Sequence, residues 1–228
     1  MLSFTYNNKK TTVYKSAVVL FAVALSIITM PLFEGTDAER IFVTLLLSVV
    51  CIAEIYNDVK IVFFYRTQLF FGSLSIFFAW LTRINYLPET LVFTEYVLFA
   101  IFFLVATIST IYKVTTCIKL NNDTIFNAIN GYLFLGFFGA SMASVLELLA
   151  ENAFMFSSSI SVFHEFEKFI YYSFVTLTTV GYGDITPASS GAKVLTIFLC
   201  VAGQLYLTVL VGLIIGKYIS NSNFKNNS

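Results

Sequence analysis

Six long apolar stretches divide this sequence and limit what it can fold into. They cover residues 13–33, 41–56, 61–81, 91–112, 125–149 and 192–219. A helix that crosses the hydrocarbon of a bilayer needs about 20 mostly apolar residues, and only the second stretch falls short of that length. Charged residues make up 11% of the chain, against about 25% in soluble domains. We therefore expect an all-α membrane protein with six transmembrane helices.

A shorter apolar run at 166–177 lies between the fifth and sixth stretches, and the sequence TTVGYGD follows it directly at 178–184. The run is too short to cross a membrane, so we expect a re-entrant half-helix. Irregular backbone at membrane depth is tolerated only where it lines a water-filled path or is buried in protein. We therefore expect the seven residues to form an extended segment beside such a path.

The two glycines suit this segment to binding ions through its backbone. Gly181 and Gly183 can adopt backbone angles that other residues avoid, and their alternate spacing lets successive carbonyl oxygens turn toward one side. A row of carbonyl oxygens can replace the water shell of a cation, and Thr179 adds a hydroxyl oxygen. Val180 and Tyr182 would then point away and pack against the surrounding protein.

The segment resembles the selectivity filter TVGYG of the potassium-channel family, and the match is complete over residues 179–183. The wider run FVTLTTVGYGDITP is also similar to that family. The resemblance implies a potassium-selective channel. It implies K⁺ bound at Thr179, Val180, Gly181 and Tyr182, with no other cofactor.

One chain supplies one wall of such a filter, and oxygens on one side cannot surround an ion. The family places four copies around a cyclic axis, and TVGYG occurs once in the 228 residues. The resemblance therefore implies a homotetramer embedded in membrane lipids.

Aromatic and polar residues flank the filter on both sides. By resemblance, Tyr171 and Tyr172 occupy positions where the family often has an aromatic cuff, while Thr178 and Asp184 border the filter and support it. A hydrogen bond from Tyr172 to Asp184 is the contact expected of such a cuff. Packing of both tyrosines against lipid or neighbouring helices is the alternative.

The last apolar stretch carries the residues expected to bend and close the pore. Gly203 lies twenty residues after Gly183, and the resemblance implies a hinge there, although a glycine can equally allow close helix packing. Leu207, Val211 and Ile215 follow at four-residue spacing on one helical face. We expect them to form an apolar constriction, and packing of this face on the fifth helix is the alternative.

Six spans with a re-entrant loop before the last form the layout of voltage-gated-like channels, whose fourth helix carries a ladder of arginines. Here the stretch 91–112 contains no Lys or Arg, and Glu95 is its only charge. Steep voltage gating needs several charges per subunit, so we predict weak or no voltage dependence.

The other charges of the front half are expected to pair, which would lower the cost of burying them. We expect Glu54 and Asp58 to pair with Arg66, and Arg83 to pair with Glu95. The predicted domains are a four-helix sensor-like domain at 1–119, a pore domain at 120–220 and a short polar tail at 221–228.

The positive charges predict the orientation in the membrane. With both termini in the cytoplasm, nine of the 13 Lys and Arg residues lie inside and four outside. The loop after the half-helix would then face outward. The compact chain without appended domains favours a prokaryotic plasma membrane.

Other functions remain open at this level. One is a weakly selective cation channel of the same architecture, and another is a non-conducting regulatory subunit. A potassium transporter is disfavoured because transporters that resemble channels carry four filter loops in one chain. No nucleophile–base pair or metal-ligand spacing indicates an enzyme, and a net charge of zero does not suggest a nucleic-acid partner. The gating stimulus, including any gating ligand, is not indicated.

Overall fold

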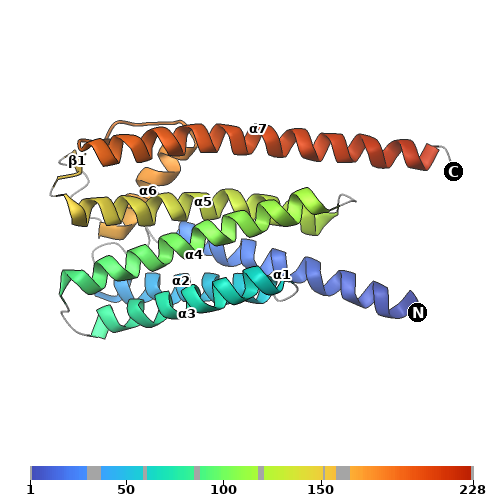
Figure 1. Cartoon of the computed structure of the whole chain (residues 1–228), viewed down its shortest axis with the longest axis horizontal. Coiled ribbons are helices and arrows are strands. Elements are labelled where there is room, and N and C mark those ends of the chain that lie inside the picture. The colour runs from blue at the N-terminus through green and yellow to red at the C-terminus, as the bar shows by residue number, and fades with distance from the viewer. Residues whose placement is uncertain are drawn as a thin grey trace.

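The computed structural model describes residues 2–29, 37–58, 61–84, 88–117, 121–150, 152–157 and 165–226. Its helices lie mostly side by side along one direction (Figure 1). They are α1 (Leu2–Thr29), α2 (Asp37–Asn57), α3 (Val62–Ile84), α4 (Glu89–Thr116), α5 (Asn122–Leu149), α6 (Glu165–Leu177) and α7 (Ser190–Asn226). The N-terminal end of α1 and the C-terminal end of α7 both extend beyond the bundle on the side away from the loop that follows α6, and they are well separated in this view.

Four of these helices are long and apolar enough to cross a membrane, within the described ranges. They cover Val62–Arg83, Glu89–Thr116, Asn122–Leu149 and Ser190–Gly216. The first two helices contain the shorter apolar stretches Tyr14–Thr29 and Ile41–Asn57. The mostly helical membrane architecture agrees with the expectation from sequence, while the count of six spans stays a prediction.

Two short strands depart from the expected all-α fold. Strand β1 (Phe154–Phe156) pairs antiparallel with β2 (Ile185–Pro187), and Met155 lies opposite Thr186. Each strand has only three residues, too few for the alternation of apolar and polar residues that would have predicted them.

Helices α1 to α4, which we call the front bundle, pack against α5 of the same chain through α4 and α1. Asn121 caps α5 by accepting a hydrogen bond from the Thr124 backbone N–H at 2.8 Å, which fixes where this helix begins soon after α4 ends. The two helices then run alongside each other over much of their length.

Buried aromatic rings fill the contact between α4, α5 and α6. Phe103 of α4 stacks on Phe137 of α5 with ring centroids 5.1 Å apart, and it also meets Phe134. Phe137 in turn contacts Phe174 of α6 edge to face at 5.9 Å. Because stacked and edge-to-face rings have preferred geometries, this chain of contacts fixes how the half-helix sits relative to the front bundle.

A buried ionic cluster lies at the end of the bundle opposite the loop after α6. Lys113 near the end of α4 forms ion pairs with Glu54 and Asp58, both fully buried, and its Nζ lies 3.3 Å from Glu54 Oε1. Gln68 and Ser109 also donate hydrogen bonds to Asp58 Oδ2, at 2.7 and 2.5 Å. We refer to these five residues as the inner ionic cluster.

The predicted partner of the two carboxylates was wrong. Arg66 is exposed on α3, whereas Lys113, one residue beyond the apolar stretch 91–112, reaches them from α4. The second predicted pair is confirmed, because Arg83 lies 3.5 Å from Glu95. Glu95 also accepts a hydrogen bond of 2.6 Å from Thr82.

Candidate functional site

Small residues on α5 let the half-helix α6 approach closely. A Cβ atom added to Gly136 would lie 2.4 Å from the Phe174 ring, and one added to Gly139 would lie 2.3 Å from Ser173 Oγ. Ser173 also donates a hydrogen bond of 2.7 Å to the carbonyl of Gly136. Small residues that bring helix backbones together are the usual basis of helix packing in lipid, so α6 is firmly seated on α5.

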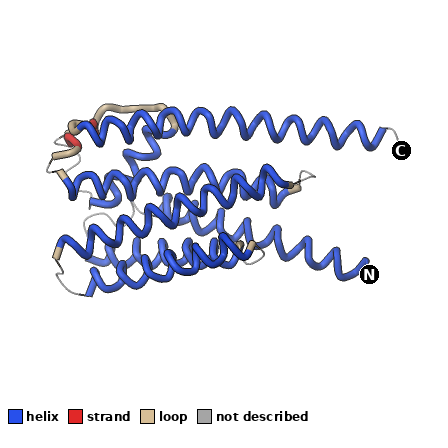
Figure 2. The backbone as a smooth tube through the Cα atoms, viewed as in Figure 1, coloured by secondary structure: helices blue, strands red, loops and turns tan. Residues whose placement is uncertain are grey.

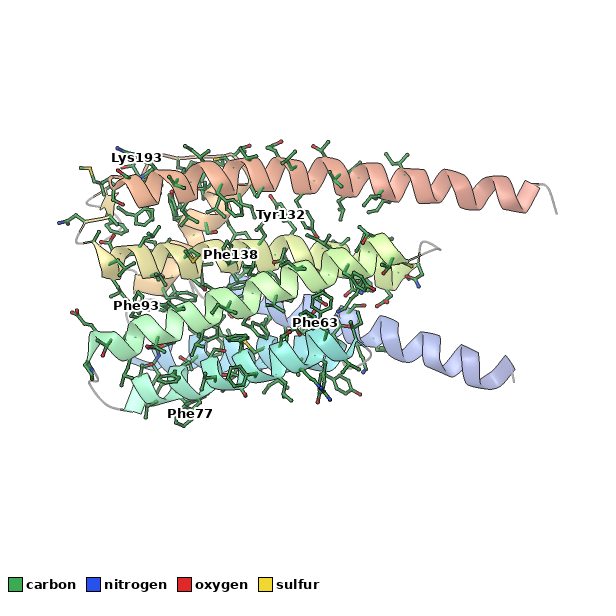
Figure 3. The ribbon with its side chains drawn as sticks, in the orientation of Figure 1. Phe63, Phe77, Phe93, Tyr132, Phe138 and Lys193 are labelled. Carbon is green, nitrogen blue, oxygen red and sulfur yellow. The ribbon has the colours of Figure 1, made fainter. Side chains whose placement is uncertain are left out.

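The last carbonyl groups of α6 all accept hydrogen bonds, although a helix leaves its last four carbonyls without partners of its own. Residues 178–181 of the loop supply most of the donors. The bonds run from Thr178 N to Phe174 O (3.0 Å), from Val180 N and Gly181 N to Val175 O (3.0 and 3.3 Å), and from Thr179 N to Thr176 O (2.9 Å). Tyr132 of α5, which lies between α5 and α7 in Figure 3, donates to Leu177 O at 3.3 Å.

Residues 178–184, which we call the filter segment, leave the helix in an unusual backbone conformation. The angle φ is positive at Thr179 (61°), Gly181 (55°) and Gly183 (80°). A strand that alternates the sign of φ can turn successive carbonyls toward one side, and glycine adopts positive φ at little cost. Figure 2 shows this loop running back alongside α7 toward the strands.

The two large side chains of the filter segment lie at the surface of the single chain. Val180 is 52% exposed and Tyr182 is 71% exposed. Tyr182 stacks on Tyr171 of α6, with nearly parallel rings and centroids 6.5 Å apart. Within the described part of one chain, Tyr182 therefore packs against Tyr171, and Val180 stays largely exposed. The predicted packing of both side chains against surrounding protein is found only in part.

The two adjacent tyrosines on α6, Tyr171 and Tyr172, form hydrogen bonds with different partners. Tyr171 donates a hydrogen bond of 2.6 Å to Asp184 Oδ2, whereas the sequence had suggested Tyr172 for this contact. Tyr172 is buried and shares a hydrogen bond of 2.5 Å with Thr196 of α7. Successive helical residues point about 100° apart, so only one of the two can face the filter segment.

The pair of strands holds the far end of the filter segment. Ser157 N donates to the carbonyl of Asp184 at 2.8 Å, and Ala188 N donates to Ala153 O at 2.9 Å. Asp184 Oδ1 also accepts a bond of 3.0 Å from Ile185 N. The segment is therefore fixed at one end by α6 and at the other by β1 and β2, an anchor that sequence reasoning missed.

Gly203 lies where α7 passes the end of α6. A Cβ atom at this position would lie 2.3 Å from the carbonyl oxygen of Leu177, so a close backbone approach explains the glycine without a hinge. Further along α7, Leu207, Val211 and Ile215 are 40% to 53% exposed rather than packed on α5. Their predicted role as a constriction stays a prediction.

A residue that sequence reasoning missed lies between the filter segment and this apolar face. Gln204 of α7 is exposed, and its Nε2 donates a hydrogen bond to Thr179 Oγ1 at 3.3 Å. The available signal was a long amide side chain in the middle of an apolar stretch, directly after Gly203.

Comparisons with known proteins find similarity in this part of the chain. Residues 142–220, about a third of the chain, match the family model described as "Ion channel". The segment is similar to ion channels. It contains the end of α5, all of α6, the filter segment and most of α7.

Two plant proteins are similar to part of the chain. "Two-pore potassium channel 4" of Arabidopsis thaliana is 44% identical over 50 residues, which are 22% of this chain and 18% of that protein. "Two pore potassium channel c" of Oryza sativa subsp. japonica is 34% identical over 83 residues, 36% of this chain and 18% of that protein. The chain thus covers less than a fifth of either relative. No solved structure matches it significantly.

Proposed function

We propose that this chain forms a potassium-selective channel that conducts K⁺ passively through a tetrameric pore. The observation that carries the proposal is the positive φ at Thr179, Gly181 and Gly183 within an intact TVGYG. The similarity of residues 142–220 to ion channels, and of shorter segments to plant potassium channels, supports it.

The filter segment would select K⁺ by replacing its hydration shell. Backbone oxygens of Thr179, Val180, Gly181 and Tyr182, together with the Thr179 hydroxyl, would form successive rings of ligands. Conduction then requires ions to bind well enough to enter but weakly enough to leave. Hydrogen bonds at both ends of the segment resist its collapse toward a smaller ion such as Na⁺.

Four copies around one axis would complete the ion sites. The 228 residues contain TVGYG once, and one strand offers oxygens on one side only. The exposed Val180 and Tyr182 would then contact neighbouring copies. The apolar residues exposed along α7 offer further contact area, and they include Val194, Ile197, Val201 and Leu205.

The front helices would contribute little voltage dependence. Moving one charge through the membrane field yields about 2.3 kcal/mol per 100 mV, and steep gating needs several charges per subunit. Lys113 is the one cation near the end of the described α4, and two buried carboxylates hold it. We place the termini in the cytoplasm, because that orientation puts most Lys and Arg residues inside.

The reversal potential of the purified protein in a planar bilayer tests this function. With K⁺ on one side and Na⁺ on the other, we expect reversal far toward the K⁺ equilibrium potential and an open fraction that hardly changes with voltage. A reversal near zero would favour a weakly selective cation channel. No current from correctly assembled protein would favour a non-conducting subunit.

A further inference from the structure

Gln204 is positioned to act on the innermost part of the filter segment. It follows Gly203, which lets α7 approach the end of α6 at Leu177. This close approach brings the Gln204 amide to 3.3 Å from Thr179 Oγ1. Both side chains are exposed within the single chain, so the contact faces the side on which neighbouring copies and ions would lie.

The backbone of Thr179 is already fixed by other contacts. Its N–H donates to Thr176 O at 2.9 Å, and its φ of 61° is rare for a residue with a branched side chain. A hydroxyl has one hydrogen to donate and two lone pairs to accept. The Gln204 amide occupies one lone pair and leaves the other for a cation.

We propose that Gln204 is a positioning residue for the innermost ion site, holding the Thr179 hydroxyl so that its free lone pair faces the ion. This inference rests on the proposed channel function. In a tetramer, four Gln204 amides would form a ring directly beneath the filter. The ring precedes the apolar face of Leu207 and Val211, three and seven residues further along α7.

Block by Ba²⁺ measures the innermost site separately from K⁺ selectivity. Ba²⁺ is close to K⁺ in size and carries twice the charge, so the same oxygen ligands hold it for longer. The full-length protein is studied in planar bilayers, with Ba²⁺ added on the side of the α7 C-terminus. The same preparation gives the reversal potential between K⁺ and Na⁺, which tests the proposed function itself.

Substitution of Gln204 should weaken Ba²⁺ block and leave K⁺ selectivity intact. Gln204→Met keeps the length of the side chain but removes the donor, and we expect block to weaken about fivefold, which corresponds to one hydrogen bond. Gln204→Asn keeps an amide on a side chain one methylene shorter and should change block in the same direction. A merely structural role would shift the reversal potential together with the block.

Thr208→Val is the matched control. Thr208 is exposed one turn further along α7, and its hydroxyl bonds only to the Gln204 backbone carbonyl at 2.8 Å among the contacts described. We expect its Ba²⁺ block to equal that of the unchanged protein. Equal shifts in Gln204→Met and Thr208→Val, or no shift in either Gln204 variant, would overturn the inference while the channel function stands. An unchanged protein without K⁺ selectivity would instead overturn the proposed function.

Discussion

The front bundle (α1 to α4) and the C-terminal part of the described chain (α5 to α7) differ in how far their groups find partners within one copy. In the front bundle, buried charges find partners within the chain, as Lys113 does with Glu54 and Asp58. In the C-terminal part, the filter segment is anchored at both ends, yet its middle, with Val180 and Tyr182, lies at the surface. The front bundle thus satisfies its buried charges within a single copy, whereas the proposed tetramer would complete the surroundings of the filter segment.

This difference predicts which property a substitution in each region should change. Changes in the front bundle remove a partner inside one chain, so their effect should appear as lost stability. Changes in the filter segment would alter the geometry of the proposed ion site between copies, so their effect should appear as lost conduction. The following predictions test that separation.

The largest effect is expected at Gly183 of the filter segment. Its φ is 80° and an added Cβ would meet nothing within 4 Å in the single chain, so within one copy Gly183→Ala acts through the backbone. A left-handed conformation costs a non-glycine residue about 1–2 kcal/mol, and the proposed tetramer would incur this cost in each of its four copies. We expect K⁺ current in planar bilayers to fall below about 1% of the unchanged protein.

Gly216→Ala serves as the control for this change. Gly216 of α7 also has open space around it but no positive φ, so we expect normal current. A Gly183→Ala protein that still conducts K⁺ selectively would show that the backbone of the filter segment does not set the ion sites.

The next largest effect is expected in the inner ionic cluster. Lys113→Met leaves Glu54 and Asp58 buried without their cation, and breaking a buried pair costs about 3–5 kcal/mol. We expect a clear loss of thermal stability in detergent, with an unchanged K⁺ to Na⁺ reversal potential. Arg66→Met, at an exposed position on α3, should change stability by less than about 0.5 kcal/mol. A changed reversal potential would contradict the separation of the two regions.

Substitution of Gly203 tests whether close packing or helix bending explains why a glycine occupies this position in α7. Gly203→Ala places a methyl group against the Leu177 carbonyl, and we expect a destabilisation of about 1–3 kcal/mol, typical of overpacking. Gly212→Ala, with open space around it, should be neutral or stabilise α7 by up to about 1 kcal/mol. If thermal unfolding shows no loss for Gly203→Ala while its open fraction changes, the hinge is the correct explanation.

The smallest effect is expected at the far end of the filter segment. Tyr171→Phe removes one hydrogen bond to Asp184, which contributes about 1 kcal/mol. Hydrogen exchange of the amides at 184–186 should become about fivefold faster. Tyr172→Phe loses its contact with Thr196 instead and should leave this exchange unchanged. Equal acceleration in both variants would mean that the two tyrosines act together as one cuff.

Much of the fold could be predicted because it follows from local properties. The stretches at 61–81, 91–112, 125–149 and 192–219 became helices of membrane-spanning length, and the run at 166–177 became the short α6. Apolar runs of a given length partition into lipid as helices whatever surrounds them. Glycine at 181 and 183 allows the positive φ found there at little cost, although other glycines of the chain, such as Gly216, keep a negative φ.

The sequence could not predict which side chains pair with one another, because side-chain pairing depends on how each helix is rotated about its axis and aligned with its neighbours. Whether Tyr171 or Tyr172 reaches Asp184 depends on which face α6 turns toward the filter segment. Whether Arg66 or Lys113 neutralises the buried carboxylates depends on the rotation of α3 and α4 about their axes.

The sequence by itself determined that this chain is a membrane protein with a half-helix and a glycine-alternating segment, because length, apolar content and glycine spacing act locally. Only the tertiary structure decided that α4 packs on α5 of its own chain, that two short strands hold the filter segment, and that Gln204 meets Thr179. These contacts join residues far apart in sequence. The energy of each contact depends on interatomic distances and angles. Helix packing sets these distances and angles, and no single segment of the sequence determines them.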